Sequence, residues 1–118
     1  MRELGDLAEE KHRELASLII KTKPRLVFLI GPLMKKYLYP ELKKLNYPTK
    51  KLFIYDFAGQ TLTDITNNLQ KNDFVLVKGS QNTIFLEIIV EHLLADKKDV
   101  KYLCRRGSYW DLERKNFI

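Results

Sequence analysis

A lysine, a glycine and a serine stand where one apolar run ends and a different apolar pattern begins. They are Lys78, Gly79 and Ser80, in the stretch "FVLVKGSQNTIFLEIIVEHLL". Glycine lets the backbone turn tightly, and serine favours the position that caps a following helix. Free amide groups at a helix start attract carboxylates and phosphates, and the lysine adds a formal charge. The junction is therefore predicted to bind an anionic group, with Gln81 and Asn82 as additional hydrogen-bonding candidates.

A purely structural interpretation of this junction stays open, because glycine and serine are also common in strand-to-helix turns that bind nothing. The same holds for Gly31 and Asp56, each of which follows a predicted strand. Open α/β sheets bind ligands at the carboxyl ends of their parallel strands. Glycine also ends strands, however, and aspartate also caps helices. We expect both residues at one edge of the sheet, where they could contact a ligand.

The sequence contains none of the common catalytic motifs. It has no GxxxxGK[ST] phosphate loop and no GxGxxG dinucleotide motif. Its two histidines, His12 and His92, fall on different predicted helices. Its single cysteine, Cys104, excludes an internal disulfide and a cysteine metal site. No catalytic residue, metal ligand or cofactor is therefore predicted for this chain.

Helical patterns and short apolar strands alternate along the chain. Strands are predicted at residues 25–30, 51–56 and 74–79, where continuous apolar runs are typical of strands buried on both faces. A helix is predicted before the first strand, beginning near Asp6, which has Glu9 at capping-box spacing. Further helices are predicted between the strands and from residue 80 onward. This order predicts a Rossmann-like, three-layer α/β fold with a small parallel sheet of about three strands, whose upstream strands are missing.

Composition and charge restrict the partners of this 118-residue chain. A net charge of +6 suits an anionic partner, but the basic residues are spread along the chain and mixed with acidic ones. This spread argues against nucleic acid, whose binders usually carry a basic cluster. The apolar runs are too short to cross a bilayer, and the acidic, polar N-terminus is unlike a signal peptide. A cytoplasmic location without a membrane partner is therefore predicted.

Three segments in a fixed order carry a family resemblance. "MRELG" is followed by His12, then by "VFLIGPLM", and later by "VLVKGS" at residues 75–80. This series resembles the C-terminal domain of the Mur ligases, in particular the branch that adds D-alanyl-D-alanine to a UDP-muramoyl tripeptide. Residues 1–95 are interpreted as such a domain, truncated at its N-terminus. Residues 96–118 are interpreted as a helical tail that packs on it.

The resemblance implies a part in peptidoglycan precursor synthesis. Mur ligases use ATP and Mg²⁺ to activate a carboxylate, which the amine of an amino acid or dipeptide then attacks. Their C-terminal domain closes on a central ATP-binding domain, brings the acceptor and excludes water. By this resemblance, Lys78, Gly79 and Ser80 contact the acceptor's carboxylate or the nearby phosphates. The chain lacks the ATP-binding domain, so it is expected to be inactive alone and to meet the UDP-muramoyl precursor only within a parent enzyme.

Two other functions are weighed against this one. A standalone Mur-ligase-like binding module is the main alternative, because the chain starts at a methionine and "QNTIFLE" replaces the family's Arg- and Met-rich continuation after Ser80. A nucleic-acid binder is the third, suggested by the net charge and "CRRGSYW". The missing upstream strands also predict an exposed strand edge, covered by a second copy of the chain in a homodimer or by the tail.

Overall fold

The chain folds as a mixed α/β protein divided into two compact units. The computed structural model describes residues 4–79 and 84–115. The first unit is Met1–Asp56 and the second is Phe57–Ile118. The predicted tail, residues 96–118, belongs to the second unit.

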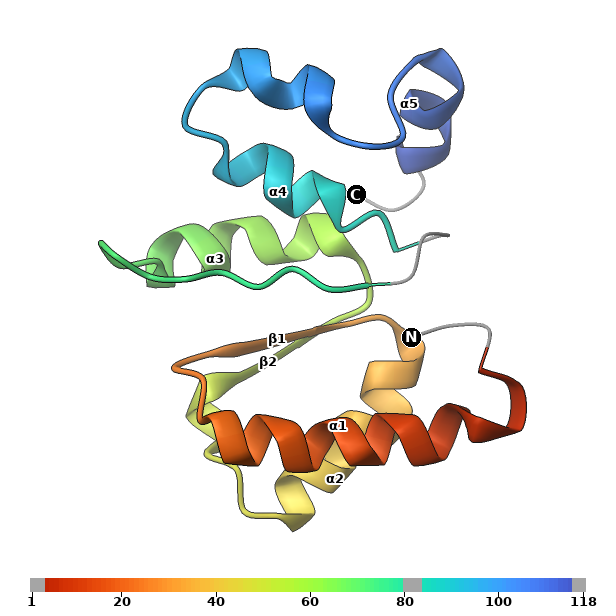
Figure 1. The fold of residues 1–118 in the computed structure, drawn as a ribbon, viewed down its shortest axis with the longest axis vertical. Coiled ribbons are helices and arrows are strands. Elements are labelled where there is room, and N and C mark those ends of the chain that lie inside the picture. Colours follow the sequence, from red (N-terminus) through yellow and green to blue (C-terminus); the bar gives the residue numbers. More distant parts are fainter. Residues whose placement is uncertain (1–3, 80–83, 116–118) are drawn as a thin grey trace. The chain divides into compact units, whose positions relative to one another are not determined.

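The first unit contains a parallel β-α-β arrangement, shown in Figure 1. Strand β1 (Val27–Ile30) pairs in parallel with β2 (Leu52–Tyr55), with Val27 opposite Leu52. A π-helical turn (Met34–Leu38) runs into helix α2 (Tyr39–Lys44) between the strands. The break in helical geometry ends directly before Tyr39, because Pro40 lacks the amide hydrogen that a regular helix would use. Two predicted strands and their parallel direction are thus confirmed.

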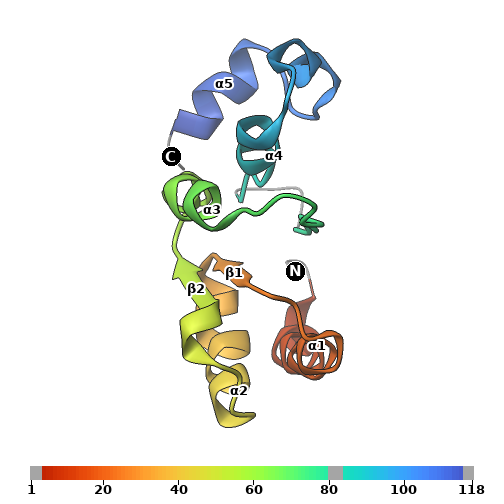
Figure 2. The ribbon, with the colours of Figure 1, turned by 90° about the vertical axis from the view of Figure 1, so that its left-hand side faces the viewer.

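Helices α1 (Ala8–Thr22) and α2 share one face of this small sheet (Figure 1 and Figure 2). Alternate strand residues point toward them, and the buried core consists of Ala16, Leu29, Leu38, Leu42, Tyr47 and Leu52. The opposite face carries a stacked aromatic ladder of Phe28, Phe53 and Tyr55, with 4.7 Å between the first two ring centroids. Within this unit the arrangement is therefore two layers, not the predicted three.

Helix α1 begins later than the predicted capping box implies. A 3₁₀ turn (Gly5–Leu7) precedes it, and its N-cap residue, Leu7, makes no side-chain capping bond. The predicted Asp6 cap is therefore wrong. The helix ends at Thr22. Its C-cap residue, Lys23, adopts a left-handed φ of 49°, and the Lys23 amide donates to the Ile19 carbonyl at 3.0 Å.

The third predicted strand is not formed in the second unit. Residues 74–79 are extended, but they pair with no strand among the described residues, and the sheet has two strands there. Phe74 is 104% exposed and Leu76 is 89% exposed. An apolar run favours extended backbone, but a strand exists only through a hydrogen-bonded neighbour, which the run itself does not specify.

The other elements described in the second unit are short helices: a 3₁₀ turn (Ala58–Thr61), α3 (Leu62–Asn68), α4 (Glu87–Leu93), a second 3₁₀ turn (Lys97–Tyr102) and α5 (Ser108–Arg114). Figure 1 shows the extended segment running back in the direction opposite to α3. The residue before α4's N-cap, Phe85, is 2% exposed and meets the edge of the Trp110 ring. This contact holds the C-terminal segment against α4.

Among the described residues, no helix is both long enough and apolar enough to cross a bilayer.

Candidate functional site

The structure brings two predicted site residues, Gly31 and Asp56, to one edge of the parallel sheet. The Gly31 amide donates to the Tyr55 carbonyl at 2.9 Å, which places Asp56 on the neighbouring chain end. Gly31 is buried with a φ of +96°, a conformation that favours glycine. The edge is the one at which parallel sheets usually bind ligands.

Lys35, which sequence analysis missed, completes this edge. Its Nζ lies 3.1 Å from Oδ1 of Asp56, and both side chains are more than half exposed. The sequence signal for Lys35 was its position four residues after Gly31, because residues one helical turn apart lie on the same side of a helix. In the structure the Lys35 amide donates to the Gly31 carbonyl at 3.2 Å. The edge therefore carries an accessible ion pair whose lysine could exchange Asp56 for an anionic ligand.

The Lys78–Gly79 junction differs from its predicted geometry. Residues 74–79 form no strand with any described residue, and α4 begins at Glu87 with Leu86 as its N-cap. Lys78 and Gly79 are both exposed in the extended segment. Ser80, Gln81 and Asn82 lie outside the described residues, and the role of the five as acceptor contacts stays a prediction.

A shallow apolar groove lies beside this extended segment within the second unit. It has a volume of about 450 Å³ and is lined by Val75, Val77, Val90, Leu93 and Leu94, together with Leu69, Gln70 and Asp73. Because side chains alternate along an extended chain, Val75 and Val77 face the groove while Phe74 and Leu76 face away. The segment thus has apolar side chains on both sides.

His12, which is part of the predicted resemblance, is fully buried on α1. Its Nδ1 lies 2.5 Å from the Ala8 carbonyl, and its Nε2 has no hydrogen-bond partner. The Tyr37 ring packs beside it, with 6.0 Å between ring centroids. This placement is typical of a packing histidine. His92, by contrast, is exposed and its Nε2 lies 2.7 Å from Oγ1 of Thr66.

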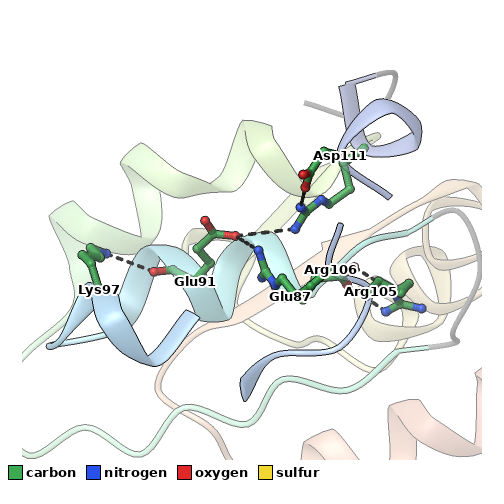
Figure 3. A network of polar contacts seen from close by, with 7 residues as sticks. Glu87, Glu91, Lys97, Arg105, Arg106 and Asp111 are labelled. Atoms are coloured by element: carbon green, nitrogen blue, oxygen red, sulfur yellow. Dashed lines mark hydrogen bonds and ion pairs between the residues drawn. The ribbon is translucent and has the colours of Figure 1, made fainter. Parts of the chain in front are cut away.

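The densest polar arrangement in the described residues is an ionic network on α4, which Figure 3 shows and which sequence analysis did not predict. Glu87 holds Arg105, and Glu91 holds Arg106 at 2.8 Å and Arg114 at 3.6 Å. Arg114 also pairs with Asp111 on its own helix. The sequence signal was the four-residue spacing of Glu87 and Glu91, which places both carboxylates on one face of a helix.

Three further interactions stabilise this network. The hydrogen bonds that Arg105 donates to Glu87 raise the pKa of the Arg105 guanidinium, so its charge is permanent. The Arg105 guanidinium also lies over the Phe85 ring, 5.6 Å from its centroid. Lys97 donates to the carbonyls of Glu91 and His92, which satisfies the C-terminal end of α4.

Metal and thiol chemistry find little support in the described residues. They contain no group of three or more His, Cys, Asp or Glu side chains arranged to hold a metal ion. Cys104 is a free, exposed thiol directly before Arg105.

Comparisons of the chain with protein-family models, with curated proteins and with solved structures found no match in any of the three. The Mur ligase resemblance therefore stays a prediction from the residues.

Proposed function

We propose that this chain is the acceptor-binding, C-terminal-type domain of an ATP-dependent ligase that joins an amino acid or dipeptide to a peptidoglycan precursor in the cytoplasm. The observation that carries the proposal is the ordered series "ELG", His12 and "VLVKGS". Two features of the first unit agree with it. The strand after His12 enters a parallel β-α-β arrangement, and the ligand-binding edge of that arrangement carries Gly31 and Asp56.

In this proposal the chain contributes positioning rather than a nucleophile. ATP and Mg²⁺, bound by the parent enzyme's central domain, supply an activated carboxylate. Lys78, exposed at the end of its extended segment, attracts the acceptor's carboxylate or a phosphate as a point charge. Gly79 keeps the backbone close to that group. Orienting an amine against an activated carboxylate accelerates the reaction without any covalent step on this chain.

The proposal also includes the complete Rossmann-like, three-layer arrangement. The aromatic face formed by Phe28, Phe53 and Tyr55 is only partly buried in the described structure. Three large rings on one sheet face would gain stability from a further covering layer. The proposal therefore assigns this face to the packing surface that completes the fold.

Amide chemical-shift mapping with D-alanyl-D-alanine tests the proposal. The purified chain is expected to give weak, saturable shifts at Lys78 and Gly79 and no ATP hydrolysis. Lys78→Gln should abolish the shifts, whereas Lys71→Gln, a matched change at an exposed lysine near the start of the same segment, should preserve them. ATP turnover by the purified chain, or dipeptide binding that ignores Lys78→Gln, would refute the proposal.

A second candidate function, a Mur-ligase-like interaction module without ligase activity, is favoured by one specific observation. Phe74 and Leu76 are almost completely exposed on an extended segment whose backbone has no strand partner among the described residues. Such a segment is a template for pairing with another chain. Light scattering separates the two functions. A dimer that becomes monomeric with Phe74→Ser or Leu76→Ser supports the module, and a monomer with an unchanged mass in both variants removes it.

A further inference from the structure

Arg106 is only partly satisfied by the network on α4. Its Nη1 donates to Oε2 of Glu91 at 2.8 Å. Its Nε and Nη2 are buried and have no hydrogen-bond partner. Native structures rarely leave buried donors unpaired, and a guanidinium cannot lose its proton to avoid the problem. Two unpaired charged donors on one side chain therefore call for a functional explanation.

The two unpaired nitrogens lie on the same edge of the guanidinium group. Nε–H and one Nη2–H point in parallel and form the fork that grips carboxylates and phosphates through two hydrogen bonds. Arg105, the residue before it, binds a carboxylate in this way. Arg105 holds the two oxygens of Glu87 through its own Nε and Nη2, at 2.7 and 2.8 Å. Arg106 thus presents the edge that Arg105 uses, but without an acceptor on it.

The carboxylates of the network are already engaged elsewhere. Glu87 is held by Arg105, Asp111 by Arg114, and Glu91 is shared between Arg106 and Arg114. Lys97 adds a further positive charge at the end of α4. The surroundings therefore offer Arg106 no second carboxylate among the contacts of the described residues, and they favour an added negative charge.

The loop side is the direction from which a ligand would reach Arg106. Its side chain is 23% exposed, although Nε and Nη2 are themselves buried. The next residue, Gly107, has a φ of +102°, and a side-chain carbon built there would meet no atom within 4 Å. The backbone directly after the arginine is therefore uncrowded by residues beyond its chain neighbours. Binding requires a movement of the Arg106 side chain that exposes the fork toward this loop.

We propose that Arg106 is the centre of a binding site for a small oxyanion, a carboxylate or a phosphate group, held through Nε and Nη2 while Nη1 stays anchored on Glu91. Glu91 acts as the positioning residue, because its contact fixes the plane of the guanidinium. This inference is independent of the ligase proposal, which assigns the acceptor to the Lys78 segment. Either proposal can fail while the other stands.

Nitrogen–proton spectra of the arginine Nε–Hε groups test the site directly, with peaks assigned through bonds from the backbone. The full chain is titrated with sodium acetate and, separately, with inorganic phosphate, at ionic strength held constant with chloride. The Arg106 Hε peak is expected to move saturably, while the peak of Arg13, an exposed arginine paired with Glu9 on α1, stays fixed.

Variants give the second readout. Arg106→Lys should weaken anion binding by about tenfold or more, since lysine keeps the charge but loses the fork. Arg13→Lys makes the same chemical change away from the site and should leave binding unchanged. A response to acetate alone assigns a carboxylate, a response to phosphate alone assigns a phosphate, and a response to both assigns a general oxyanion site. An unmoved Arg106 peak with both anions overturns the proposal, and if Arg106→Lys does not fold, this wild-type titration decides alone.

Discussion

Glu87 and Arg105 are joined by two parallel hydrogen bonds, with their side chains only 3% and 15% exposed. The pair links α4 to the loop before α5. Arg105 adopts a left-handed φ of 55° at the point where the loop turns toward α4. A non-glycine residue in this conformation is strained, so the ion pair and the Phe85 ring beneath it must hold the loop in place. The contact is therefore an anchor for the C-terminal segment.

Removing one partner of this pair should be strongly destabilising. Glu87→Gln leaves the permanently charged Arg105 without its counter-ion, which typically costs about 3–5 kcal/mol. Urea unfolding followed by the fluorescence of Trp110, the chain's single tryptophan, measures the loss. Glu10→Gln, the same change on an exposed face of α1, is the matched control and should cost less than about 0.5 kcal/mol. Equal losses in the two variants would contradict the anchoring role.

Gly79 and Leu86 should be energetically coupled. A side-chain carbon added at Gly79 would overlap the end of the Leu86 side chain and lie 3.1 Å from its Cγ. Gly79→Ala is therefore expected to cost about 1 kcal/mol, the low end for overpacking, because the leucine end can shift. In a Leu86→Ala background the same change should cost less. A double-mutant cycle by urea unfolding measures the coupling, and additive losses would show that the two residues do not touch.

Local patterns in the sequence predicted the elements that local physics determines. The apolar runs that became β1 and β2 are bounded by Pro24 and Gly31 and by Pro48 and Asp56, so their type and position could be read directly. The carboxyl edge followed from their parallel order. Gly31 and Asp56 therefore lie where the strand order placed them.

Patterns failed where tertiary partners decide. Residues 74–79 have the composition of a buried strand, but pairing depends on a neighbour that composition cannot name. The start of α4 was misplaced because a serine after an apolar run is a common cap but does not fix where a helix begins. The N-cap of α4 is Leu86, and Phe85 before it adopts a left-handed φ of 50°. Arg106 was missed because the sequence does not show which carboxylates pair with which arginines. Only the structure shows that Nε and Nη2 of Arg106 have no hydrogen-bond partner.

The ion pair between Lys35 and Asp56 should contribute little to stability. Both side chains are more than half exposed, so water and salt screen their attraction. Lys35→Met and Asp56→Asn should each change the free energy of unfolding by less than about 1 kcal/mol. Urea unfolding at low and at high salt checks this, and the double variant should match the sum of the single ones. A salt-sensitive loss well above that value would show that the pair is structural and unable to exchange Asp56 for a ligand.

Tyr47 should make stability fall in alkali. Tyr47 is 7% exposed in the first unit's core, and its hydroxyl donates to the Pro24 carbonyl at 3.0 Å. Burial disfavours the phenolate and raises the pKa of Tyr47 above the ordinary value of 10.0. Above that value the unfolded chain releases the proton while the folded chain keeps it. The stability contribution is therefore full below pH 10 and declines as the pH rises through the raised folded pKa.

Tyr47→Phe separates the hydrogen bond from this titration. Near pH 8 the variant should be less stable by about 1 kcal/mol, the value of one hydrogen bond. Near pH 10.5 the difference should narrow, since only the wild type loses stability by deprotonating in the unfolded state. Urea unfolding at the two pH values measures the difference in unfolding free energy between the wild type and the variant. The control is Tyr102→Phe, at a tyrosine that is 76% exposed, for which this difference should be the same at both pH values. A wild type and a Tyr47→Phe variant that lose equal stability between the two pH values would mean that the hydroxyl ionises as readily in the fold as in the unfolded chain.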